Sequence, residues 1–157
     1  MSTTDSFVQD IITLHQAVHG LLREEIAGLD AAALNWKPVP ESSAIGTLIV
    51  HALGAEAEML RNLLQIPTDR VRDAEFAAQQ HAPAALERTI AAAEQDWLEL
   101  APQLDAGALQ TERPRPNKPV PQSGLFWLVR NYGHMREHVA QIQLTKQLYA
   151  AQTAAPA

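Results

Sequence analysis

The stretch SGLFWLVRNYGHMREHVAQIQLTKQLY, residues 123–149, decides the fold because its apolar side chains recur every three or four residues. The positions that form this stripe are Leu125, Leu128, Tyr132, Met135, Val139 and Ile142. A stripe with this period is one face of an α-helix, and such a face is stable only when it is buried against other elements. The stretch therefore predicts a long helix that packs in a bundle.

Three other segments show the same helical period. The first runs from about residue 7 to Gly28, with Phe7, Ile11, Leu14, Val18, Leu21 and Leu22 on its apolar face. The second spans about 44–65, and Ser42 or Ser43 is expected to cap its first turn. The third begins at Pro83, with Leu86, Ile90, Ala93, Trp97, Leu100 and Leu104 as its stripe. Together the four segments predict an all-α protein, a four-helix bundle.

The 157 residues fit a single domain, residues 1–157, with an ordered core of about 5–149. Four prolines between residues 105 and 123 predict a long loop there, and a polar connector follows Pro67. Both connectors are long enough to recross a bundle. Spacing alone therefore leaves up-down-up-down and crossover topologies open.

Composition narrows the classes of partner. The formal net charge of −6 disfavours binding to nucleic acid or to an anionic membrane surface, which leaves a small-molecule substrate as the expected partner. The chain contains no cysteine, so any thiol chemistry needs a thiol from outside. No signal peptide and no long apolar run is visible, and a cytoplasmic location is the expectation.

The histidines carry the candidate chemistry. Two pairs, His15 with His19 and His134 with His138, have the four-residue spacing that places both rings on one helix face, where they could share a metal. His51 lies at the edge of the apolar stripe of the second helix. Glu56 falls within that stripe, and a buried carboxylate needs a partner. Glu56 could orient a metal ligand by hydrogen-bonding to it without touching the metal, or it could form a salt bridge with an arginine.

Two familiar metalloenzyme classes fail on ligand counts. His134 to His138 reads His-x-x-Glu-His, the motif of inverted zinc peptidases, which need an acidic ligand well downstream. No Asp or Glu follows His138, and Glu137 points away from the face that carries the two histidines. Di-iron bundles of the ferritin type need Glu-x-x-His on two helices, and this chain has none.

Taken together, LNWKPVPESSAIGTLIVHALGAE and GHMREHVAQIQLTKQL resemble the DinB-like (DinB/YfiT) superfamily of metal-binding four-helix bundles. The positions that match are Trp36, Pro38, Ser42 or Ser43, His51, His134, His138, Gln141 and Ile142. The resemblance implies that His51, His134 and His138 form one metal triad, that the topology is up-down-down-up and that the protein is a homodimer. The last motif departs from the family's frequent His-Arg-Gly-Gln, which leaves the role of the neighbouring residues open.

Three imidazole ligands leave coordination positions open, as in catalytic sites, and they suit zinc, nickel or iron. Similar proteins of this superfamily include thiol S-transferases and thiol-dependent isomerases. We therefore expect a divalent metal that activates water or a low-molecular-weight thiol cosubstrate, in an S-transferase or a hydrolase. The alternative is a non-catalytic, dimeric, stress-related bundle whose metal site is incidental.

Overall fold

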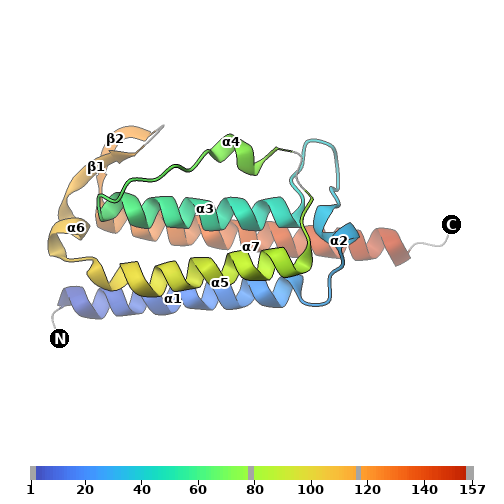
Figure 1. Ribbon diagram of the computed structural model, residues 1–157, viewed down its shortest axis with the longest axis horizontal. Coiled ribbons are helices and arrows are strands. Elements are labelled where there is room, and N and C mark those ends of the chain that lie inside the picture. Colours follow the sequence, from blue (N-terminus) through green and yellow to red (C-terminus); the bar gives the residue numbers. More distant parts are fainter. Residues whose placement is uncertain (1–2, 78–79, 116–117, 155–157) are drawn as a thin grey trace.

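A computed structural model of the chain describes residues 3–77, 80–115 and 118–154, and four long helices packed side by side dominate it (Figure 1). They are α1 (Thr3–Ile26), α3 (Ile45–Leu63), α5 (Pro83–Leu100) and α7 (Gly124–Ala154). Helices α1 and α7 run in one direction and α3 and α5 in the other (Figure 1). The predicted all-α four-helix bundle and its up-down-down-up topology are confirmed. In the described part of the chain, no helix is long and apolar enough to cross a membrane.

Two of the predicted helix ends follow local sequence signals. Gly28, just after α1, has φ 76°, a conformation that favours glycine, and Pro83 is the first residue of α5. The expected serine cap of α3 is wrong. Helix α3 follows Ala44 without a side-chain cap, and the Ser42 hydroxyl instead donates to the Val39 carbonyl at 2.8 Å. Ser42 therefore closes the preceding turn. A short helix, α2 (Ala31–Asn35), lies earlier in this connector.

The region 105–123 is not the plain loop that its prolines predicted. After the 3-10 turn η1 (Ala101–Gln103) it forms α6 (Ala106–Gln110) and the antiparallel strands β1 (Glu112–Arg115) and β2 (Lys118–Ser123). Asp105 caps α6, with its Oδ1 accepting from the Ala108 amide at 2.7 Å. In a two-stranded ribbon both strands are edges, so prolines can sit where no ladder donor is needed.

The connector between α3 and α5 recrosses the whole bundle, which places these two helices parallel (Figure 1). We call the described residues 64–77 and 80–82 the crossing connector; they include one short helix, α4 (Arg72–Glu75). At its end, the backbone amide and carbonyl of His81 both bond the side chain of Asn35, at 2.8 and 2.9 Å. The connector is thus tied to the bundle by specific bonds.

The core consists of two apolar clusters that follow one another along the bundle. One is built by Val18, Leu22, Ile26, Ile45, Ile49, Leu53, Leu86, Ile90, Met135, Val139 and Ile142, among others. The other is built by Val8, Ile11, Ile12, Met59, Leu60, Leu63, Trp97, Leu104, Trp127 and Leu128, among others. Between them in sequence lie the buried polar residues His15 on α1, Glu56 on α3 and Asn131 on α7. We call these three residues, together with the buried His19 one turn beyond His15, the polar layer.

Two predicted core positions are wrong. Leu14 is 39% exposed and Leu125 is 44% exposed, whereas their neighbours His15 and Trp127 are buried. The ring of His15 stacks on Trp97, with centroids 3.9 Å apart, and bonds Glu56. These contacts orient the His15 side chain into the core, and Leu14, the adjacent residue on the helix, consequently faces outward. A pattern based on hydrophobicity alone does not register such a polar anchor.

Candidate metal centre

The structure brings His51, His134 and His138 together in one cluster, which we call the three-histidine centre. His51 comes from α3, and the other two come from adjacent turns of the neighbouring helix α7. The His51 ring lies 5.4 Å from the His134 ring and 5.1 Å from the His138 ring, centroid to centroid. One nitrogen of each ring can be chosen so that all three lie within 4.8 Å of one another. The predicted triad is therefore assembled.

Hydrogen bonds outside the cluster orient two of the rings. The Nδ1 atom of His51 lies 2.8 Å from Oε2 of Glu75, and the Nδ1 atom of His138 lies 2.8 Å from Oε1 of Gln141. Because both partners are oxygen acceptors, each Nδ1 carries the hydrogen and each Nε2 keeps its lone pair. Nε2 of His138 faces Nε2 of His134 at 3.2 Å. Lone pairs converging in this way fit a shared cation.

The electrostatics of the cluster favour neutral rings. Burial and, after it, the neighbouring His138 and His51 rings lower the pKa of His134 to about 4. Burial also lowers the pKa of His138. The pKa of His51 is lowered too, with burial as the largest cause and Glu75 acting in the opposite direction. Neutral imidazole is the form that binds metal, so all three rings are prepared as ligands at neutral pH.

The carboxylate behind His51 belongs to Glu75, which sequence reasoning missed. Glu75 lies in α4. Arg70 donates two hydrogen bonds to its carboxylate, from Nε to Oε1 at 2.6 Å and from Nη2 to Oε2 at 2.8 Å. Arg70 also donates from Nη1 to Oε2 of Glu58 on α3, at 2.9 Å. The local sequence TDRVRDAEF offers no periodicity or motif that marks Glu75, because its partner lies 24 positions away in the chain.

Glu56, the residue predicted to orient a metal ligand, has different partners. Its Oε1 lies 2.5 Å from Nδ1 of His15, and its Oε2 lies 2.8 Å from Nε2 of His19. The alternative of an arginine partner is wrong too, because both oxygens are taken by histidines. The pair His15 and His19 thus serves the polar layer of the core and stays outside the three-histidine centre.

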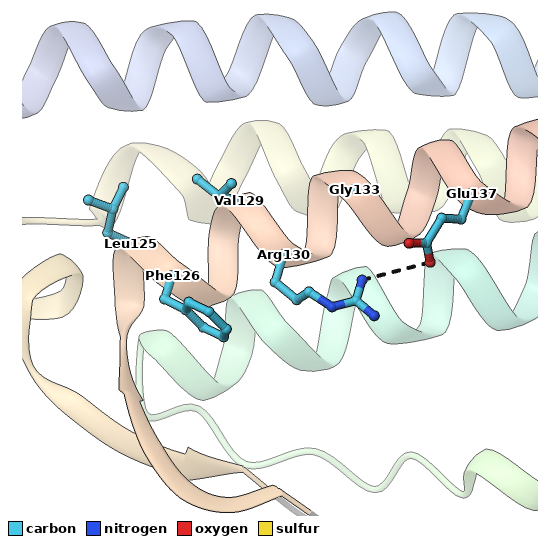
Figure 2. A pocket seen from close by; sticks show the side chains of 6 residues that line it. All are labelled: Leu125, Phe126, Val129, Arg130, Gly133 and Glu137. Atoms are coloured by element: carbon cyan, nitrogen blue, oxygen red, sulfur yellow. Dashed lines mark ion pairs between the residues drawn. The ribbon is translucent and has the colours of Figure 1, made fainter.

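The centre is most open beside His134, whose side chain is 25% exposed, while His51 is 8% exposed. A shallow groove of about 530 Å³ runs over the adjoining turns of α7 (Figure 2). Its lining is Leu125, Phe126, Val129, Arg130, Gly133 and Glu137. Arg130 reaches toward Glu137, with Nη1 3.8 Å from Oε2 (Figure 2). None of the three histidines lines the groove, but Gly133 and Glu137 flank His134.

The donor set fits a divalent cation of the imidazole-binding kind. In the described part of the chain, no fourth histidine, aspartate or glutamate joins the cluster. Structural zinc sites are normally closed by four protein ligands, whereas catalytic sites keep a position for water or substrate. Three convergent imidazoles with a partly exposed edge have the second arrangement. Glu137 does not complete the set, because its side chain is 62% exposed and its Oε2 lies 3.8 Å from Nδ1 of His134.

Comparison with known proteins supports the family and the fold. A family model described as the DinB superfamily matches residues 14–142, a range that contains all three histidines. Among solved structures, a conserved protein from Enterococcus faecalis superposes with a TM-score of 0.71 at 17% sequence identity. The match covers 94% of this chain and 97% of that one. At this identity the likeness bears on the fold alone. No curated protein matches the chain significantly.

Proposed function

Since the chain belongs to the DinB superfamily, we propose that it is a metal-dependent enzyme in which His51, His134 and His138 hold one divalent cation. The observation that carries the proposal is the convergence of three rings whose nitrogens lie within 4.8 Å of one another. Zinc, nickel and iron all suit imidazole ligands. A cation held there would lower the pKa of water or of an external thiol and so supply a nucleophile at neutral pH.

The protein's own residues have defined tasks in this proposal. Glu75 and Gln141 hold the hydrogens of His51 and His138 on Nδ1, which keeps the opposite nitrogens aimed at the centre. The partly exposed edge at His134 admits the substrate, and the apolar wall of Leu125, Phe126 and Val129 lies along the same helix. An electrophile with an apolar portion suits this approach. The absence of cysteine from the chain means that a thiol cosubstrate is not captured as a disulfide.

The test is a turnover assay on untagged protein loaded with zinc, nickel or iron. We expect S-transfer between a small thiol and a soft electrophile, or hydrolysis of an activated ester, only in the metal-loaded protein. Chelation should abolish the activity and readdition of the metal should restore it. If a stoichiometric metal is bound but no thiol, electrophile or ester supports turnover, the enzyme proposal is wrong.

One observation favours the second candidate, a dimeric bundle that acts by binding. Leu125, Phe126 and Val129 form an exposed apolar patch on α7, and Val129 is 54% exposed. Patches of this kind often mark interaction sites. Arg130 and Glu137 lie on either side of Gly133, where an added Cβ would meet nothing within 4 Å. An antiparallel α7 pair centred there would place Arg130 of each copy near Glu137 of the other, so we propose that a second copy occupies this face.

Replacing Val129 with glutamate is expected to weaken the dimer by at least about tenfold, because a charge would be buried at the contact. Sedimentation over a range of protein concentrations measures the change. Val120→Glu is the matched control, since Val120 is 66% exposed on β2 and outside the patch. A wild-type protein that stays monomeric at all concentrations would remove both the dimer and the second candidate.

A further inference from the structure

The crossing connector lies along a single face of α3, and its contacts follow one another in antiparallel order. His81 reaches Thr47, with Nε2 3.4 Å from the hydroxyl oxygen, and Glu75 reaches His51 at 2.8 Å. Arg70 reaches Glu58 at 2.9 Å. Positions 47, 51 and 58 share a helix face with position 54 because their spacings are four, three and four residues. His51 thus belongs both to this face and to the three-histidine centre.

Gly54 shows how closely the connector approaches α3. A Cβ added at this position would overlap Oε1 of Glu75 and lie 3.1 Å from Nε of Arg70. Glycine within a helix costs about 1 kcal/mol relative to alanine. The cost has a structural reason here, since a larger residue would require the Glu75 carboxylate to shift from its place beside Arg70. The phenyl ring of Phe76 also covers the His51 ring, with centroids 4.6 Å apart.

We propose that residues 68–76, which we call the strap, dock on α3 in a manner coupled to metal binding, with Glu75 as the positioning residue for His51. The inference rests on the proposed function, since it concerns the metal that the three histidines would hold. One imidazole ring links the two events: its Nδ1 bonds Glu75 of the strap, which leaves Nε2 as the nitrogen that can bind the metal. Arg70 keeps both Glu75 oxygens fixed and ties them to Glu58.

The coupling must act in both directions. If the docked strap raises the affinity of the centre for metal, then bound metal must stabilise the docked strap by the same factor. Loss of a partner that orients a metal-binding histidine typically costs 10–100-fold in affinity. The strap residues Arg70 and Glu75, together with Glu58 on α3, carry a summed charge of −1. This net negative charge also favours a cation close by.

The experiment compares the full-length wild type with Glu75→Gln and with Arg70→Gln. Zn²⁺ affinity is measured by competition with a chromophoric chelator, and hydrogen exchange of residues 68–76 is followed with and without Zn²⁺. We expect affinity to fall roughly 10–100-fold in both variants. We also expect Zn²⁺ to slow exchange of the strap in the wild type and to do so much less in the variants. Helix content and melting temperature verify that each variant folds.

Asp73→Asn is the matched control, because Asp73 also lies in α4 and its side chain is 95% exposed. It should bind Zn²⁺ like the wild type. If Glu75→Gln and Arg70→Gln bind Zn²⁺ as tightly as Asp73→Asn, or if Zn²⁺ leaves strap exchange unchanged in the wild type, the coupling is wrong while the proposed metal site stands. If the wild type binds no Zn²⁺, Ni²⁺ or Fe²⁺, the proposed function fails and the coupling fails with it.

Discussion

Replacing Glu56 with glutamine is expected to destabilise the protein by about 3 kcal/mol, because the isosteric amide cannot accept a hydrogen bond on both ends. The carboxylate is 2% exposed and bridges His15 on one oxygen and His19 on the other. With glutamine, one ring must lose its partner or adopt the other tautomer inside the core. The melting temperature should fall by about 6–12 °C for a chain of this size.

The prediction has a pH signature. Burial raises the pKa of Glu56, but the bonds from His15 and His19 lower it by more, and the result lies below the ordinary value of 4.5. A carboxylate with a lowered pKa in the folded state stabilises the fold above its unfolded pKa. That stabilisation is lost as the pH falls below about 4.5, through the folded-state pKa. The glutamine variant should lack this component, so the wild type and the variant should converge in acid.

Glu24→Gln is the matched control, because Glu24 is exposed on α1. Its unfolding free energy should stay within about 0.5 kcal/mol of the wild-type value. Equal stability of Glu56→Gln and wild type at pH 7 would show that the polar layer contributes nothing to the fold. The polar layer would then lower the stability of the fold, since each unpartnered buried polar atom costs free energy of unfolding. In the described structure such atoms occur on His15, His19, Trp97 and Asn131.

Replacing His51 with alanine is expected to abolish stoichiometric metal binding. His51 is the ligand that α3 contributes, and without it only the two histidines of α7 remain. The loss should exceed the 10–100-fold that removal of a ligand's hydrogen-bonding partner causes. Elemental analysis of the untagged variant beside the wild type measures the effect, with about one metal per chain expected in the wild type.

The control for His51 is another histidine outside the centre. His81→Gln removes a buried ring that bonds Thr47, and this variant should keep its metal. If His51→Ala retains its metal, the metal is bound at another place in the protein. His15 and His19 are poor hosts for it, because Glu56 bonds one nitrogen of each and both rings are fully buried.

Local sequence determined most of the bundle. The apolar period of 3.6 residues, Gly28 after α1 and Pro83 at the start of α5 depend only on neighbours within a few turns. The four-residue spacing also placed His134 and His138 on one helix face. It could not decide whether this pair or the pair His15 and His19 binds the metal, because both have the same spacing. The family resemblance, which draws on positions far apart in the chain, selected the triad with His51.

The tertiary structure alone decided which partner each buried polar group has. Glu56 and Glu75 are both glutamates near apolar residues, yet one bridges two core histidines and the other orients a ring of the candidate metal centre. The bonds of Glu56 join residues 37 and 41 positions apart, and that of Glu75 joins residues 24 apart. Periodicity states which face of a helix is buried. It does not state which side chain of another helix that face will meet, because that depends on how the helices pack and where the connectors cross.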